Sequence, residues 1–474
     1  MKPCWGSFGC VFADPAGAHM FLSPHRTMCT VVIALGVGCS GAPSTPAPVT
    51  PAPVTPAPPE PPPEQPPHVV LVTVDTMRAD SMVCSGATSR LTPNICALAE
   101  RGRRYTHAIS PAPATLPALT SIFTHSQVAN EAPETLVAHY DALPTLAQVL
   151  QSRGLQTAAF TDHHVLGHSP AVPVYPPSVI QRGFEVFENF GTDRRGLGAS
   201  QVTDAAIAWL SDHSQAPYLL WVHYFDPHFN YRPDPALAEQ MGFSKARCGR
   251  VTNGLDITEI REMESTLSPE ELACLKLLHE AEIHATDAAI GRLLAALPTD
   301  PAPLILFAAD HGEEFLERNR IGHEWTLYNE LIHVPFVAVG PGIPIETEAR
   351  VVSTLELHSL ATGIPVALSG AVYSRTSHYY GKTPDLSKVR QRANEHALIT
   401  DREKVILHPD GRVERFNLRI DPGERDTLST VEPLLGQLRS RITALTVTER
   451  SPSPSAIQED RAARQRLRQL GYVE

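Results

Sequence analysis

The stretch HVVLVTVD at residues 68–75 decides the fold of this chain. It is a nearly continuous run of β-branched and apolar residues, which is typical of a parallel strand buried on both faces. Similar runs recur along the chain at 155–160, 218–225, 303–310 and 334–340. We therefore expect one sheet built from strands that are far apart in the sequence.

Helical patterns alternate with these strands. They occupy residues 92–102, where Thr92 is a candidate N-cap, and also 143–154, 202–213 and 280–297. The alternation predicts an α/β fold, in which a mostly parallel central sheet forms the middle of a three-layer sandwich. In such a sheet the functional groups gather at the carboxyl ends of the strands.

Residues 346–474 differ in pattern from residues 68–345. Strand-like runs within 396–418 are separated by Pro-Asp-Gly, which is a hairpin signal, and a helical pattern follows at 431–442. We expect an N-terminal α/β domain over 68–345 and a smaller C-terminal antiparallel sheet with a covering helix over 346–474. Residues 459–474 are expected to form one more surface helix.

Residues 1–39 have the features of an export signal. A short basic region and an apolar run precede Cys39, which predicts a lipoprotein-type leader with Cys39 as the lipidation site and Met20 as a candidate start. Simple secretion after cleavage of a plain signal is the alternative. Residues 40–67 repeat Thr-Pro-Ala-Pro-Val units and are expected to form an extended spacer. We expect an exported protein that is lipid-anchored to a bacterial membrane and faces the periplasm or the cell surface.

The composition limits the classes of function. The chain has 474 residues, of which 42% are hydrophobic, and this is enough for a large core. Its formal net charge is -12, so a nucleic acid partner is not expected. An anionic substrate would need local positive charge or a metal. Beyond the leader, no stretch is long and apolar enough to cross a membrane, so the lipid anchor is the only membrane contact expected.

Four of the eight cysteines lie in the folded part: Cys84, Cys96, Cys248 and Cys274. In an exported chain they can form two disulfides, most simply Cys84 with Cys96 and Cys248 with Cys274, although the sequence alone leaves the pairing open. Their spacings do not match a zinc ribbon, so a structural zinc is not expected.

Carboxylates and imidazoles follow three of the predicted strands. Asp75 ends the first, Asp226 and His228 follow the run at 218–225, and Asp310 with His311 follows a later one. Each residue alone would be explained by a turn or a helix cap. As a set at one edge of a sheet, they predict a metal or catalytic site.

Eight segments of the sequence resemble segments of a known family. The segments, in chain order, are VTVDTMRADSMVC, TPNICALAERGRRYTHAISPAP, LLWVHYFDPHFNY, AEIHATDAAIGRLLAAL, FAADHGEEFLE, GHEWTLYNELIHVPFVAVGPG, FNLRIDPGERDTL and LRQLGYVE. Together they resemble bacterial sulfatases of the alkaline phosphatase superfamily over residues 68–474. Each segment alone is a weak signal, and their shared order makes the resemblance specific.

The resemblance implies one divalent cation, usually calcium, held beside the nucleophile. Asp75 resembles the first metal aspartate of the family, and Asp310 with His311 resembles the pair that follows the later strand. Oxygen ligands suit calcium or magnesium, and the added imidazole also suits manganese or zinc. Many sulfatases have two consecutive aspartates where this chain has Asp75 and Thr76, a departure shared with phosphonate and phosphodiester hydrolases among the relatives.

Three further histidines gain roles from the resemblance. His228 matches a family histidine that contacts the substrate or protonates the leaving oxygen. His323 falls where many relatives have a lysine that grips the ester anion, and a histidine there can donate a hydrogen bond. His223 lies inside a strand and is expected either to pack there or to support the residues that react.

The residue at the position of the nucleophile is the main departure from the family. Sulfatases have a cysteine there that is converted to formylglycine, whereas this chain reads TLPAL from Thr115. Formylglycine is therefore not expected, and Thr115 resembles the threonine nucleophile of related nucleotide pyrophosphatases and phosphodiesterases. Leu119 replaces a family arginine that stabilises charge, Ala118 precedes it, and His125 replaces a glycine after the helix.

Two hypotheses follow. The first is a metal-dependent hydrolase that cleaves a sulfate, phosphate or phosphonate ester of a small molecule, glycan or lipid through Thr115, with phosphate diesters or phosphonates favoured. The second is a catalytically inactive protein that keeps the fold and an anion pocket, which Leu119, Ala118 and His125 favour. A phosphoethanolamine-type transferase is disfavoured, since such relatives carry several transmembrane helices.

Overall fold

The structure is a computed structural model, and it describes residues 68–84, 91–127, 142–163, 166, 179–191, 198–365, 370–376, 394–432 and 434–448. The predicted leader with Met20 and Cys39, the proline-rich spacer and the predicted helix at 459–474 lie outside these residues.

The central element is an eight-stranded sheet with the order β10-β2-β9-β6-β1-β5-β3-β4. Among these strands β9 runs antiparallel to both of its neighbours, and the other pairs are parallel. The strands are β1 (His68–Val74), β2 (Arg103–Ile109), β3 (Gln156–Thr161), β4 (Val186–Asn189), β5 (Tyr218–Tyr224), β6 (Leu304–Ala309), β9 (His333–Val339) and β10 (Glu346–Ser353). The predicted mostly parallel sheet is confirmed.

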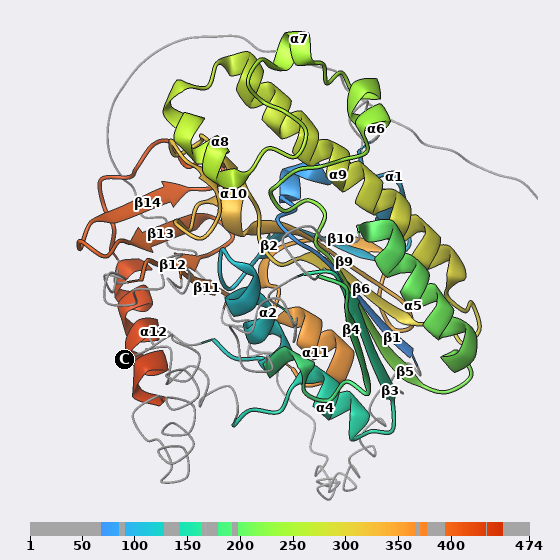
Figure 1. Cartoon of the computed structure of the whole chain (residues 1–474). Coiled ribbons are helices and arrows are strands. Elements are labelled where there is room, and N and C mark those ends of the chain that lie inside the picture. The colour runs from blue at the N-terminus through green and yellow to red at the C-terminus, as the bar shows by residue number, and fades with distance from the viewer. Residues whose placement is uncertain are drawn as a thin grey trace, which may run out of the picture. The chain divides into compact units, whose positions relative to one another are not determined.

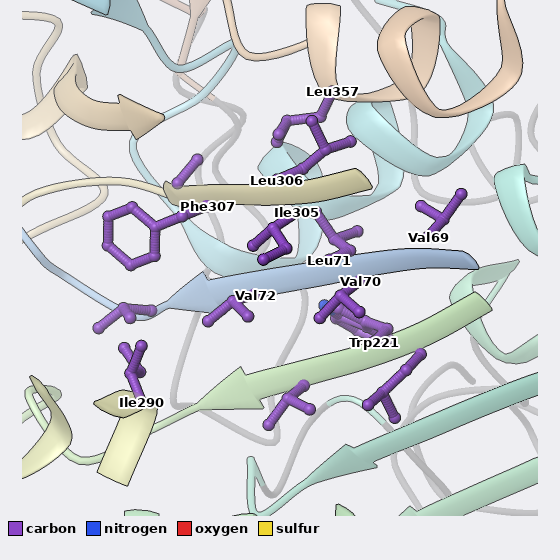
Figure 2. Packing of buried hydrophobic residues seen from close by; sticks show 14 of the residues in the cluster. Val69, Val70, Leu71, Val72, Trp221, Ile290, Ile305, Leu306, Phe307 and Leu357 are labelled. Atoms are coloured by element: carbon purple, nitrogen blue, oxygen red, sulfur yellow. The ribbon is translucent and has the colours of Figure 1, made fainter. Parts of the chain in front are cut away.

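Strand β1 lies between β6 and β5 inside the sheet, and all of its residues are buried. Figure 2 shows its valines and Leu71 between Trp221 of β5 and the apolar side chains of β6. In the same view Leu357 and Ile290 lie on opposite sides of the strands. Apolar contact on both faces explains why β1 has no polar residue before Thr73 apart from His68 at its start.

Helices cover both faces of the sheet (Figure 1). On one face lie α1 (Pro93–Ala99), α5 (Ala199–His213) and α9 (Pro269–Ala296). On the other face lie α2 (Thr115–Thr124), α4 (Leu146–Gln151) and α11 (Glu356–Thr362). The three-layer α/β sandwich expected from the sequence is therefore confirmed.

Local signals explain where these helices begin. Helix α9 starts with a capping box, in which the Ser268 side chain accepts from the Glu271 amide and Glu271 accepts from the Ser268 amide. Pro269 is its first helical residue, where the missing amide costs nothing. Thr145 and Gln148 form the same kind of box at α4. Thr92 precedes α1 as expected, but its side chain makes no capping hydrogen bond.

Short elements fill the segment between β5 and α9 and the loops after β1, β3 and β6. They are the helices α6 (Pro235–Gln240), α7 (Lys245–Cys248), α8 (Ile257–Met263) and α10 (Asn329–Ile332), the 3-10 turns η1 (Ala79–Ser81), η3 (Val179–Gln181) and η4 (Glu264–Thr266), and the strand pair β7 (Glu314–Phe315) and β8 (Ile321–Gly322).

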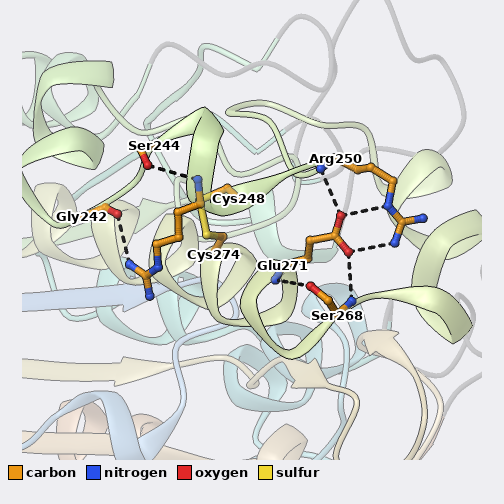
Figure 3. Close-up of a disulfide and its surroundings, with 8 residues drawn as sticks. Gly242, Ser244, Cys248, Arg250, Ser268, Glu271 and Cys274 are labelled. Atoms are coloured by element: carbon orange, nitrogen blue, oxygen red, sulfur yellow. Dashed lines mark hydrogen bonds and ion pairs between the residues drawn. A yellow bond between two sulfur atoms is a disulfide. The ribbon is translucent and has the colours of Figure 1, made fainter.

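Both expected disulfides are present. Cys84 bonds to Cys96, and Cys248 bonds to Cys274. Figure 3 shows the second one tying α7 to α9, with Arg250 and Glu271 paired nearby. The pairing that the sequence left open is thereby settled in favour of the simplest arrangement.

A second sheet of four strands has the order β11-β12-β13-β14, and its strands pair antiparallel. The strands are β11 (Val372–Arg375), β12 (His396–Ile399), β13 (Glu403–Leu407) and β14 (Val413–Asn417), and α12 (Leu434–Thr448) packs against them. The smaller antiparallel sheet with its covering helix is confirmed.

The division of the chain at residue 345 stays a prediction. Strand β10 begins just after it and pairs with β2 at the edge of the large sheet, and α11 packs on that sheet as well. The large sheet therefore takes residues from both sides of the predicted division. Within the described residues, none of the helices is long and apolar enough to span a membrane.

Candidate active site

Two aspartates lie side by side at the carboxyl edge of the large sheet. The amide of Asp75 donates to the carbonyl of Tyr224 at 2.9 Å, and the amide of Asp310 donates to the carbonyl of Val74 at 3.2 Å. These bonds continue the ladders that join β1 to β5 and to β6. Both side chains are completely buried. The pairing of neighbouring strands thus brings together carboxylates that are separated by more than two hundred residues.

His311 completes a compact group with these aspartates. One ligand atom from each of Asp75, Asp310 and His311 lies within 4.8 Å of the others. His311 Nε2 is 3.5 Å from Asp75 Oδ1 and 3.6 Å from Asp310 Oδ2. His311 Nδ1 donates to the carbonyl of Gly312 at 2.9 Å, so Nε2 is the nitrogen presented to the carboxylates.

Burial and mutual charge act in opposite directions on these groups. Burial would raise the pKa of Asp75, but His228 and other nearby histidines hold this pKa well below its usual value. Burial, with the negative charge of Asp75, raises the pKa of Asp310 to about 7. Burial lowers the pKa of His311, but Asp310 and Asp75 outweigh it, so the net direction is upward. The carboxylates of Asp75 and Asp310 therefore both depend on the positive charge of nearby histidines.

Thr115 lies beside this group as the first residue of α2. Its Oγ1 is 3.4 Å from Asp75 Oδ2 and 3.2 Å from His311 Nε2, and the residue is 5% exposed. Pro117 falls in the first turn of the helix, where a proline is tolerated. The hydroxyl of Ser110 donates to the carbonyl of Asp310, which ties the approach to α2 to the later strand. The positive end of the helix therefore faces the aspartates.

The departures that follow Thr115 have structural explanations. Leu119 is fully buried and shares the core face of α2 with Ile122 and Phe123. His125 ends the helix in the left-handed conformation with φ 53°, which a glycine would adopt more easily. A side chain at position 119 therefore contributes to packing in this chain, and it carries no charge toward the site.

The predicted histidines lie in different positions relative to Asp75 and His311. The ring of His323 lies 4.4 Å from that of His311 and 4.9 Å from that of His228. His228 Nδ1 donates to the Phe229 carbonyl at 2.5 Å. His223 is completely buried inside β5, with Nδ1 2.8 Å from the Thr73 hydroxyl and Nε2 3.8 Å from Asp75 Oδ2.

Glu313 orients His323. Its Oε1 is 2.9 Å from His323 Nδ1, and its Oε2 accepts from the Tyr231 hydroxyl at 2.9 Å. Burial raises the pKa of Glu313 to about 7, although His279 and His311 act against this. Glu313 was not among the residues predicted from the sequence, although it lies two residues after His311.

Asp226 serves a helix instead of the cluster at Thr115. Its Oδ1 accepts from the Ala199 amide at 2.8 Å, at the start of α5. Burial and the neighbouring Asp162 raise the pKa of Asp226 to about 7. Of the polar residues predicted at this edge, Asp226 is therefore the one that the capping interpretation explains.

The sequence analysis missed His163. It follows β3, and its Nε2 lies 3.0 Å from Asp75 Oδ2. Burial lowers the pKa of His163 to about 4, despite the opposing effect of Asp75. The signal was available, because Asp162 and His163 come within three residues of the end of the predicted strand at 155–160, as do the polar residues predicted after other strands.

Comparison with known proteins identifies the family. The Sulfatase family profile matches residues 67–361, which is more than half of the chain. The chain belongs to the sulfatase family, and this membership makes it an ester hydrolase.

Among curated relatives, arylsulfatase K of Rattus norvegicus is 24% identical over 446 residues, which cover 79% of this chain and 78% of that protein. The ulvan-active sulfatase of Formosa agariphila is 25% identical over 306 residues, covering 58% of this chain and 56% of that protein. Matches to other curated relatives span about half of their length.

Among solved structures, the phosphonate monoester hydrolase of Agrobacterium radiobacter has a TM-score of 0.59 and 16% sequence identity, covering 81% of this chain and 96% of that one. This likeness shows that the two chains share a fold.

Gly312→Ala is expected to disturb the site through the backbone. A Cβ at this position would lie 2.2 Å from the carbonyl oxygen of Glu330, so the loop that carries His311 must shift. We expect the free energy of unfolding to fall by about 1–3 kcal/mol, as for other overpacked sites, and ester turnover to fall by roughly 10²-fold. Urea denaturation and initial rates measure both.

Gly436→Ala in α12 is the matched control, since its Cβ would meet only the flexible side chain of Glu432 at 3.3 Å. It is expected to keep full activity and to leave stability unchanged or slightly raised. Equal behaviour of the two variants would contradict the close approach at Gly312.

Proposed function

We propose that the chain is a metal-dependent ester hydrolase in which Thr115 is the nucleophile. The observation that carries this proposal is the position of the Thr115 hydroxyl, 3.4 Å from Asp75 and 3.2 Å from His311 at the start of a helix. A nucleophilic oxygen in such a place faces carboxylate and imidazole ligands and the positive end of a helix dipole.

The residues fit a divalent cation at Asp75, Asp310 and His311. Asp75 Oδ1 and Asp310 Oδ2 are buried and have no hydrogen-bond partner among the described residues. Carboxylate oxygens left in this way are costly unless a cation or proton compensates them. When bound, the cation would lower the pKa of the Thr115 hydroxyl and stabilise negative charge on the ester. The family resemblance implies calcium as the cation. The oxygen ligands also suit magnesium, and the imidazole of His311 also suits manganese or zinc.

The chain's own groups would divide the remaining work. The Thr115 hydroxyl loses its proton to solvent and its oxygen attacks the phosphorus or sulfur atom, while the departing alcohol oxygen takes a proton from His228 or His323. Glu313, 2.9 Å from His323 Nδ1, keeps that ring oriented. Water then attacks the same atom and gives a proton to the histidine that lost one, and the Thr115 oxygen leaves and takes back a proton from solvent. Threonine cannot be converted to formylglycine, so the hemiacetal route of sulfatases is not part of this proposal.

The second attack favours phosphorus over sulfur. A threonyl adduct must be displaced by water at the central atom, and phosphoryl and phosphonyl centres accept this step more readily in sites built around metal ions. We therefore propose phosphate diesters or phosphonate esters of a small molecule, glycan or lipid as substrates in preference to sulfate esters.

The first experiment compares Thr115→Ala and Thr115→Ser on an aryl phosphate diester, an aryl phosphonate and an aryl sulfate. We expect turnover of the diester or phosphonate to fall by roughly 10³-fold or more in the alanine variant, with partial retention in the serine variant, because only serine keeps a nucleophilic oxygen. Thr124→Ala, at the other end of α2, removes a hydroxyl that donates only to the Thr120 carbonyl at 2.7 Å, and it should keep most of the activity.

Arylsulfatase turnover that exceeds phosphodiesterase turnover and survives Thr115→Ala would refute both the nucleophile and the substrate preference. Absence of turnover with every ester, in a protein that binds inorganic phosphate, would support the inactive anion-binding protein instead.

Removal of metal is expected to abolish turnover and to lower stability. Chelation leaves only the neighbouring imidazoles to offset the charge of the Asp75 and Asp310 carboxylates, and a cation at a hundred times its dissociation constant contributes about 2.7 kcal/mol to stability. Rates and thermal unfolding before chelation, after it, and after addition of calcium, manganese or zinc measure the effect. Asp310→Asn should mimic the chelated state, while Asp204→Asn, whose side chain is 61% exposed, should not. Full activity in the presence of excess chelator would count against the metal.

We also propose export and anchoring through a lipid on Cys39. The support is the predicted leader followed by a proline-rich spacer. The full chain expressed in bacteria should sediment with the membrane fraction, and Cys39→Ala should release it into the soluble exported fraction. Equal distribution of both proteins would favour simple secretion.

A further inference from the structure

Asp75 belongs to two clusters of possible metal ligands. One is the group with Asp310 and His311, and the other consists of Asp75, His163 and His228, again with ligand atoms within 4.8 Å of one another. The two oxygens of Asp75 face different clusters. Oδ1 lies 3.5 Å from His311 Nε2, whereas Oδ2 lies 3.0 Å from His163 Nε2. This is the arrangement of a carboxylate that bridges two cations.

We propose that Asp75, His163 and His228 hold a second divalent cation of the zinc type, so that the chain carries a two-cation centre bridged by Asp75. This inference rests on the proposed Thr115 hydrolase and adds a site to it, and with His228 as a ligand the protonation of the departing oxygen falls to His323. The family resemblance implied only one cation, and its ligand set did not include His163.

The donor set suits zinc. Two imidazoles and one carboxylate, with a fourth position left for water or substrate, is a ligand set of catalytic zinc sites. Zinc bonds of about 2 Å in a tetrahedron place neighbouring ligand atoms about 3.3 Å apart, which is near the 3.0 Å between His163 Nε2 and Asp75 Oδ2. His228 Nδ1 donates to the Phe229 carbonyl, and this hydrogen bond fixes Nε2 as its ligand nitrogen.

The backbone around His163 is held in place. Its amide donates to the Thr161 hydroxyl at 3.1 Å, and its carbonyl accepts from the Asn189 side chain at 2.9 Å. The ring also packs edge-on against Phe225 at 4.4 Å between centroids. A ligand that must hold its geometry needs such support from its surroundings.

A second cation would also replace positive charge that the site lacks. Asp75, Asp310 and Glu313 place three completely buried carboxyl groups at the site, whereas Leu119 of α2 is part of the core and carries no charge. Two cations about 3.5–4 Å apart can stabilise both the attacking and the leaving oxygen of a phosphoryl transfer. The Thr115 hydroxyl, 3.4 Å from Asp75 Oδ2 and 3.2 Å from His311, lies where both cations would reach it.

The test is metal stoichiometry in the full chain. Protein stripped by chelation is titrated with zinc, freed of excess metal by gel filtration and assayed by elemental analysis. We expect two equivalents in the wild type, one in His163→Asn and one in Asp310→Asn. His107→Asn changes an exposed histidine and should keep two. A second readout is the electron paramagnetic resonance of manganese-loaded wild type, in which bridged ions should give an exchange-coupled spectrum and His163→Asn an isolated-ion spectrum.

The outcomes separate this inference from the proposed function. One equivalent in both the wild type and His163→Asn, or two equivalents in both, would overturn the second site and leave the one-cation hydrolase standing. Binding of no metal by the wild type would overturn both. Should His163→Asn fail to fold, an isolated-ion manganese spectrum in the saturated wild type would by itself reject the bridged pair.

Discussion

The hydrogen bonds that join β1 to its two neighbours are the constraint on which the site depends. Parallel strands in register end at the same edge, so the residue after β1 must lie beside the residue after β6. Asp75 and Asp310 are brought together by backbone bonds to Tyr224 and Val74. The apolar side chains of β1, buried on both faces, stabilise that register.

The carboxyl groups of the site lower the stability of the core in which they are buried. Asp75, Asp310 and Glu313 are all completely buried, and an uncompensated buried charge costs several kcal/mol. Neighbouring imidazoles offset part of this cost, and a cation would offset more. Buried carboxyl groups that lower the stability of a core are typical of active sites. Their presence here agrees with membership in a family of ester hydrolases.

The residues around the candidate site form a coherent set. Thr115 places a hydroxyl at the start of α2, Leu119 packs into the core, and His323 is hydrogen-bonded to Glu313. His163 adds an imidazole next to Asp75. A site rich in imidazoles and carboxylates offers ligands for metal ions, and this connects the proposed preference for phosphorus esters with the proposed second cation.

The sequence by itself determined the elements of this protein. Its apolar runs predicted the main strands, their alternation with helices predicted the sandwich, and the residues at strand ends predicted Asp75, Asp310 and His311 as neighbours. These features follow from local patterns and from a general rule about parallel sheets. Only the tertiary structure decided that Asp226 caps α5 and that His163 reaches Asp75. Side-chain direction and strand order depend on packing between distant segments, which no local pattern contains.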